Sequence, residues 1–158
     1  MNPSRKRTRL KDYDYGAPGA YFVTICTWQK EKILSQILVG EGLCALPKVI
    51  LTDTGRLVDR AIRYLMEKET DFVVDRYVIM PNHVHLMIRV EDKGGRGGPP
   101  LQDIIHRIKS YTTHQYGGKL WQRSFHDHVV RNEQDYLEIL KYIEHNPAKW
   151  LEDTYYTE

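Results

Sequence analysis

Cysteine and long apolar runs are both scarce in this sequence. Its only two cysteines, Cys26 and Cys44, stand far apart and form no Cys-x-x-Cys spacing, which excludes a disulfide framework and the common cysteine-based zinc sites. No apolar run approaches the roughly 20 residues that a membrane-spanning helix needs. The start of the chain, Met1–Lys11, is polar and basic and does not resemble a signal peptide. We therefore expect a protein of the reducing cytoplasm with no membrane partner.

The chain also lacks a strong net charge, since 23 lysines and arginines against 21 acidic residues leave +2 at pH 7. A charge this small does not by itself identify a nucleic-acid partner. The basic residues are nevertheless unevenly distributed, because five of them precede Asp12, the first acid: Arg5, Lys6, Arg7, Arg9 and Lys11. Residues 1–18 thus form a basic N-terminal arm. It is either a solvated tail or an extension in which Arg5, Arg7 and Arg9 bind DNA phosphates.

The length of 158 residues and the hydrophobic content of 41% fit a single domain over residues 1–158. Apolar residues show no sustained period over residues 30–48, so this segment is predicted to be a connecting loop, with a short extended piece at 49–51. Residues 91–100 are predicted to be a flexible loop rich in glycine and proline. The remaining pattern predicts, in order, a strand at 21–28, a helix at 53–66, strands at 71–80 and 83–88, a helix at 101–116, a strand at 127–131 and a last helix from Asn132.

The most informative stretch is the strand that begins at His83. Side chains alternate along a strand, so His83 and His85 share one face and the apolar side chains between and after them share the other. Pro81 and Asn82 form a turn signal just before the pair, which favours a tight antiparallel pairing with the preceding strand. Two neutral imidazoles at this spacing can hold one metal ion if a third ligand arrives from elsewhere. A bare His-x-His is also compatible with two half-exposed histidines that bind nothing.

The last helix presents a tyrosine and an asparagine on one face. At about 100° per residue, Tyr142 falls beside the apolar stripe and Asn146, four residues later, falls nearly beneath it. Pro147 disfavours helical backbone at the residue before it, so Asn146 ends the helix and its amide can reach outside. The stripe itself consists of Tyr136, Ile139, Leu140 and Ile143. We expect one combined site from this helix and the histidine strand.

Two motifs resemble those of a known family. His83-Val84-His85 resembles the histidine–hydrophobic–histidine signature of the HUH endonucleases, and Tyr142–Lys149 resembles the tyrosine motif of their single-tyrosine transposases. The resemblance is closest to the REP-associated tyrosine transposases, relatives of the insertion-sequence transposases that act on single-stranded DNA. It covers nearly the whole chain, with further matching segments at Tyr21–Thr24, Met80–His85, Leu120–Phe125 and Asp127–Arg131. One departure is Asn146, where the insertion-sequence branch usually has glutamine.

The resemblance implies an α+β fold: a ferredoxin-like antiparallel sheet, similar to RNA-recognition domains, with an added C-terminal helix that carries the tyrosine. It implies a metal-dependent single-stranded DNA endonuclease and strand transferase that acts on hairpin-bearing DNA. Tyr142 would be the nucleophile that forms a 5′-phosphotyrosine, and His83, His85 and Asn146 would hold Mg²⁺ or Mn²⁺. A phenol with a pKa of about 10 is a poor nucleophile at neutral pH, and a cation on the phosphate compensates for this. The family contains monomers and dimers, so the sequence does not decide between a monomer and a homodimer.

Basic residues in the second half of the sequence are the other candidates for DNA contact. Four of them are predicted to bind the DNA backbone: Arg107, Lys109, Arg123 and Arg131. The nearby aromatics Trp121 and Phe125 are predicted to pack in the core rather than to stack on bases. Two other functions remain open, a binding module for single-stranded DNA or RNA without catalysis and a metal hydrolase that uses a bound water.

Overall fold

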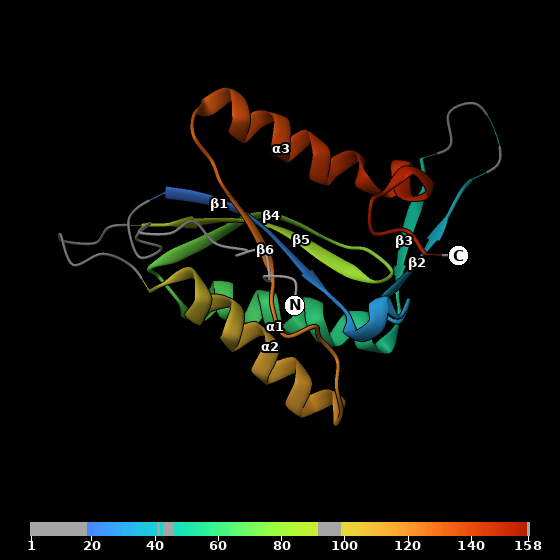
Figure 1. Cartoon of the computed structure of the whole chain (residues 1–158), viewed down its shortest axis with the longest axis horizontal. Helices are drawn as coiled ribbons and strands as arrows, with labels where there is room; N and C mark the ends of the chain where they lie inside the picture. Colours follow the sequence, from blue (N-terminus) through green and yellow to red (C-terminus); the bar gives the residue numbers. More distant parts are fainter. Residues whose placement is uncertain (1–18, 41, 43–45, 92–98, 158) are drawn as a thin grey trace, which may run out of the picture.

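The centre of the fold is a four-stranded antiparallel sheet. The computed structural model describes residues 19–40, 42, 46–91 and 99–157, so the basic arm and most of the predicted 91–100 loop lie outside the described residues. The spatial order of the strands is β4 (Phe72–Ile79), β5 (His83–Val90), β1 (Gly19–Cys26) and β6 (His126–Val129) (Figure 1). All neighbouring strands are antiparallel. This order is that of a ferredoxin-like sheet and confirms the predicted fold class.

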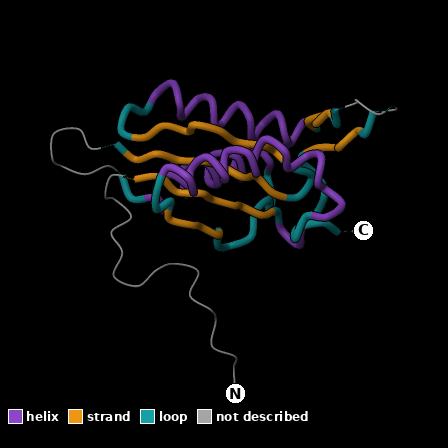
Figure 2. Tube along the Cα trace, turned by 90° about the horizontal axis from the view of Figure 1, so that it is seen from above, coloured by secondary structure: helices purple, strands orange, loops and turns teal. Residues whose placement is uncertain are grey.

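Helices cover both faces of the sheet. The helices α1 (Asp53–Lys68) and α2 (Leu101–Tyr116) lie against one face, and α3 (Glu133–His145) crosses the other (Figures 1 and 2). Their starts and ends follow the sequence signals, since Thr52 and Asn132 cap α1 and α3, and Gly117 ends α2 in a left-handed conformation. No helix in the described part of the chain is long and apolar enough to cross a membrane.

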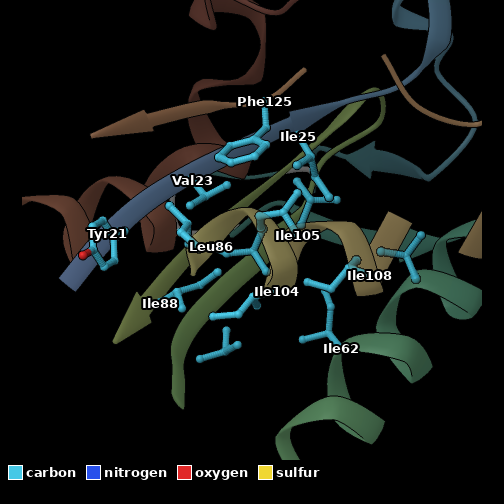
Figure 3. Packing of buried hydrophobic residues seen from close by; sticks show 14 of the residues in the cluster. Tyr21, Val23, Ile25, Ile62, Leu86, Ile88, Ile104, Ile105, Ile108 and Phe125 are labelled. Atoms are coloured by element: carbon cyan, nitrogen blue, oxygen red, sulfur yellow. The ribbon is translucent and has the colours of Figure 1, made fainter. Parts of the chain in front are cut away.

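The hydrophobic core fills the space between the sheet and the pair α1 and α2 (Figure 3). Each strand sends alternate side chains into it, as the period of two requires. Burying one large aliphatic side chain in this way contributes roughly 1.5–3 kcal/mol. The sheet and the two helices contribute, among others, Tyr21, Val23, Ile25, Leu86, Ile88, Ile62, Ile104, Ile105 and Ile108. Because this face supplies the core, the opposite face is free to build a site beneath α3.

The structure corrects two sequence predictions. The segment predicted as a connection contains β2 (Ser35–Leu38), which pairs with β3 (Lys48–Leu51) in a separate two-stranded sheet. β2 is only four residues long and carries two polar residues, so its sequence gives little strand signal. In α1, helical spacing predicts an inward face of Leu57, Ala61, Ile62, Leu65 and Met66, but Met66 is exposed and Val58 is fully buried instead. At about 100° per residue, Met66 falls at the edge of the stripe that Val58, Ile62 and Leu65 present to the core.

Gly55 lies where α1 approaches another segment most closely. A Cβ atom at this position would lie 1.9 Å from the carbonyl oxygen of Leu34. That carbonyl also accepts hydrogen bonds from the backbone N–H of Thr52, at 3.0 Å, and from its hydroxyl, at 3.0 Å. The start of α1 is therefore held against Leu34, and only glycine fits at position 55 without a clash.

We predict that Gly55→Ala destabilises the protein by roughly 1–3 kcal/mol, as overpacking does. The loss should appear although alanine is the better helix former by about 1 kcal/mol. Urea unfolding followed by circular dichroism measures the free energy of unfolding. Gly118→Ala is the matched control, because its Cβ would meet only Tyr116 ring atoms at 3.7 Å and beyond. Equal stability of the two variants would contradict the close contact.

Candidate metal and tyrosine site

The two predicted histidines lie side by side on the sheet face beneath α3. His83 opens β5 and His85 follows two residues later, and both side chains are buried. Their Nε2 atoms are 3.1 Å apart. Since β5 pairs with β1 on one side and β4 on the other, both rings are anchored at the centre of the sheet. The sequence predicted the shared face correctly but not the burial.

Two polar neighbours orient the imidazoles through their other ring nitrogens. Asn82 Oδ1 lies 2.8 Å from His83 Nδ1, and Thr24 Oγ1 lies 2.7 Å from His85 Nδ1. An amide oxygen only accepts, so His83 carries its proton on Nδ1 and its Nε2 lone pair faces His85. Hydrogen bonds of this kind commonly fix the ring orientation of metal-binding histidines. The sequence identified Asn82 only as a turn residue. It did not indicate a role for Thr24, because that role depends on the register between β1 and β5.

Asn146 and Asp153 complete the cluster from the C-terminal side. Asn146 is 2% exposed, and its amide donates to Asp153 Oδ2 at 2.9 Å. Within the described part of the chain the amide oxygen, Oδ1, is buried without a hydrogen-bond partner. Asp153 Oδ2 is also 3.6 Å from His83 Nε2. One ligand atom each from His83, His85 and Asp153 lie within 4.8 Å of one another.

This donor set fits a divalent cation. Two nitrogens and a carboxylate converge on a small volume, and the partnerless amide oxygen of Asn146 is the kind of buried acceptor that a cation would satisfy. Asp153 was missed in the sequence because it shares no helix face with Tyr142. It reaches the site only because the 3₁₀ helix η2 (Asn146–Glu152) turns the chain back.

The predicted nucleophile lies next to the cluster. The ring centroid of Tyr142 is 5.3 Å from that of His85 and 5.8 Å from that of Phe22, and the residue is 42% exposed. Burial and the charge of Asp153 raise the pKa of Tyr142, while a hydrogen bond with Asn146 opposes that shift. The phenol is thus protonated at neutral pH, close to the metal-binding groups and open to solvent.

A second tyrosine, Tyr155, covers the histidines from the C-terminal tail. Its ring centroid is 4.6 Å from that of His83 and 5.9 Å from that of His85. The backbone carbonyl of Tyr155 accepts from Asn82 Nδ2 at 2.7 Å, so the tail is tied to the same residue that orients His83. The tail therefore buries the imidazoles. No sequence periodicity pointed to Tyr155.

Both imidazoles are neutral at neutral pH. Burial lowers the pKa of His83 to about 4, against a weaker opposing effect of the Asp153 carboxylate. Burial, and then the nearby His83, lower the pKa of His85 well below 6.5. The 3.6 Å contact between His83 and Asp153 is consequently not an ion pair near pH 7. Neutral imidazole is the form that binds metals.

The predicted DNA-binding residues lie in several places. Arg107 pairs with Glu69 at 2.7 Å, and Lys109 Nζ donates to the carbonyls of Gln122 and Ser124, both at 2.8 Å. Arg123 and Arg131 have exposed side chains near the two ends of the segment that forms β6. Arg5, Arg7 and Arg9 lie outside the described residues. Trp121 and Phe125 are buried, which confirms the packing interpretation.

Comparisons with known proteins agree with this fold. No family model matches the chain. It is 30% identical to an uncharacterised protein of Haemophilus influenzae, over 98% of this chain and 94% of that protein. It is 29% identical to a REP-associated tyrosine transposase of Escherichia coli, over 63% of this chain and 58% of that protein.

A solved structure shows the same fold at lower identity. The structure of a REP-associated tyrosine transposase bound to a REP hairpin superposes with a TM-score of 0.66 at 22% identity, and the match covers 89% of this chain and 73% of that one. The fold and one curated relative are those of a tyrosine transposase. Within that class, the chain is similar to the REP-associated tyrosine transposases.

The lowered pKa values predict how the stability of the metal-free protein depends on pH. Unfolded histidines titrate near 6.5, whereas folded His83 titrates at about 4. Between these values the unfolded state binds more protons than the folded state. The contribution of His83 to the free energy of unfolding is therefore complete above pH 6.5 and is lost on acidification towards pH 4. We expect His83→Gln to flatten this part of the profile in urea unfolding with EDTA. A variant with the wild-type slope would contradict the assignment.

Proposed function

We propose that this protein is a metal-dependent single-stranded DNA endonuclease and strand transferase that acts through a 5′-phosphotyrosine. The observation that carries the proposal is the convergence of an accessible phenol, two neutral imidazoles and the Asp153 carboxylate at one place on the sheet. The amide of Asn146 contacts this carboxylate, and its oxygen has no partner among the described residues. A module that only binds nucleic acid has no need for a buried, desolvated set of metal-binding groups. Similarity to REP-associated tyrosine transposases supports the same conclusion.

The metal would be held by Nε2 of His83, Nε2 of His85 and Oδ1 of Asn146, with the Asp153 carboxylate as an additional oxygen ligand. A mixed nitrogen and oxygen set that leaves room for phosphate oxygens suits Mn²⁺ or Mg²⁺. When bound, such a cation neutralises charge on the scissile phosphate and polarises it. The hydrogen bond from Asn146 Nδ2 to Asp153 leaves the amide oxygen available as a ligand.

Tyr142 would perform the chemical step. Its phenolic oxygen forms a bond to phosphorus while the bond to the 3′ oxygen breaks; the phenol loses its proton and the departing 3′ hydroxyl gains one. The energy of the phosphodiester is kept in the 5′-phosphotyrosine, so another 3′ hydroxyl can reverse the step. Since the pKa of Tyr142 is raised mainly by burial, its proton must leave as the bond forms. The Asp153 carboxylate, whose charge acts on Tyr142, is the group that we assign to accept this proton.

The arrangement supports catalysis within one chain. Tyr142 lies against the His85 of its own sheet, so a second copy is not needed to supply the tyrosine. The substrate class is single-stranded DNA that carries a hairpin, because the structural relative was solved with a REP hairpin. Arg123 and Arg131 are the exposed basic residues that we assign to its backbone. Arg107 and Lys109 already have intramolecular partners, so their contribution would require exchange of those contacts.

Replacing the nucleophile gives the sharpest test. Tyr142→Phe removes one oxygen and keeps the ring, so folding and DNA binding should persist while cleavage and the covalent adduct fall below detection. The assay mixes protein, Mn²⁺ and a labelled hairpin-bearing single strand and looks for a denaturation-resistant band. Tyr136→Phe on the same helix is the matched control: it loses a 2.7 Å hydrogen bond to Asp75, which should cost about 1 kcal/mol of stability and leave the adduct. Mapping the phosphotyrosine to another residue would overturn the assignment.

Removing a metal ligand should have a different signature. We expect His83→Ala and His85→Ala each to abolish Mn²⁺-dependent cleavage and to weaken Mn²⁺ binding in calorimetry without DNA. Affinity for the single strand in EDTA should change little, because neither imidazole is exposed. His106→Ala, at an exposed position on α2, is the control for loss of an imidazole. Wild-type cleavage by the double variant would refute the metal site.

A further inference from the structure

A second concave site lies beyond the end of β1, on the side of the sheet that carries α2. It is a cavity of about 540 Å³ lined by Trp28, Lys119, Trp121 and Arg123. None of these residues takes part in the metal and tyrosine site. The lining combines two indole rings with two cations, which is the chemistry expected for a ligand with a flat ring and a negative charge.

The two tryptophans play different parts in this cavity. Trp121 is 8% exposed, and its indole N–H donates to Thr112 Oγ1 at 2.8 Å, so it belongs to the core. Trp28 is 36% exposed, and the ammonium of Lys119 lies 4.2 Å from its ring centroid. Trp121 therefore forms the floor of the cavity, and Trp28 is the ring that is available to a ligand.

The backbone holds Trp28 in this position at a conformational cost. The backbone N–H of Trp28 donates to the carbonyl of Leu120 at 2.8 Å. This bond ties the short 3₁₀ helix η1 (Trp28–Lys30) to the loop that carries Lys119. The next two residues, Gln29 and Lys30, have positive φ values of 52° and 54°, where residues other than glycine are strained. A strained turn that keeps a large aromatic ring at the surface is more readily explained by binding than by packing.

The cavity is close to the proposed cleavage site along the sheet. Cys26 pairs with His83 in the β1–β5 register. The next residue, Thr27, forms an antiparallel β-bridge with Trp121, and its backbone N–H donates to the Asn82 carbonyl at 2.9 Å. Trp28 is two residues beyond Cys26, roughly 7 Å at the rise of an extended chain. Thus the end of β1, which pairs with the start of β5 at His83, leads directly to the cavity.

We propose that this cavity binds one nucleotide of the single-stranded DNA flanking the cleaved phosphodiester. The base stacks on Trp28, and its phosphate contacts Lys119 and Arg123. Every base has a π-face, so stacking of this kind tolerates different sequences, and the two cations match the negative backbone. The proposal rests on the proposed function only in taking single-stranded DNA as the ligand.

Binding is measured without chemistry, so that the result does not depend on the cleavage mechanism. The protein is the full chain with Tyr142→Phe in EDTA, and the probe is a fluorescein-labelled hairpin oligonucleotide with single-stranded thymidine flanks. Trp28→Leu should weaken binding by roughly 5- to 150-fold, the range for loss of one stacked base. Trp28→Phe should recover part of that loss. Lys119→Met should lower the slope of log affinity against log salt by about 0.7, the value for one phosphate contact.

Tyr64→Leu is the matched control, because Tyr64 is an exposed aromatic residue on α1 that stacks on Tyr111 away from the cavity. It should change affinity less than twofold. Thermal unfolding of every variant shows whether it is folded, and photo-crosslinking from 5-iododeoxyuridine in the flanks should yield an adduct on the peptide that contains Trp28. The crosslink tests the contact even if Trp28→Leu is unstable.

The outcomes separate this inference from the proposed function. If the parent protein binds the oligonucleotide but folded Trp28→Leu binds equally well, or the crosslink falls on other peptides only, the nucleotide site is wrong and the proposed function stands. If the parent protein does not bind the single strand at all, both are wrong. Weakened binding by Trp28→Leu together with unchanged binding by Tyr64→Leu supports the site.

Discussion

The pairing of β1 with β5 is the constraint on which the rest of the molecule depends. Its register sets Thr24 opposite His85 and Cys26 opposite His83, and a shift by one residue would turn the imidazoles into the core and the apolar residues towards α3. The core residues on the other face prevent such a shift, because Val84, Leu86 and Ile88 are fully buried against α1 and α2. Hydrophobic packing on one face thereby determines the position of the chemistry on the other.

The C-terminal segment provides the second half of the site. The chain leaves α3 at Asn146, turns through η2 and returns with Asp153 and Tyr155 over the histidines. This return excludes water, which accounts for the lowered pKa of both imidazoles. The buried site retains its polar groups because most of them hydrogen-bond to one another, and the acceptor without a partner among the described residues, Asn146 Oδ1, is one that a bound cation would satisfy.

Most of the architecture was predictable from local patterns. The α1 and α2 boundaries, the turn before His83 and the edge strand β6 follow from period, capping and turn chemistry, which depend only on neighbours in the sequence. β2 was not predictable, because it forms by pairing with β3 rather than by its own propensity. The alternating face of His83 and His85 and the shared helix face of Tyr142 and Asn146 also follow from elementary geometry.

The sequence by itself determined the strands and helices other than β2, the two histidines on one strand face and the shared helix face of Tyr142 and Asn146. Each of these is encoded within about ten consecutive residues. Only the tertiary structure decided that Asp153, Thr24 and Tyr155 join the site and that both imidazoles are buried and neutral. It also decided that Trp28 and Lys119 meet at a cavity. These residues come together through strand register and chain reversal, and contacts between distant segments leave no periodic trace in a single sequence.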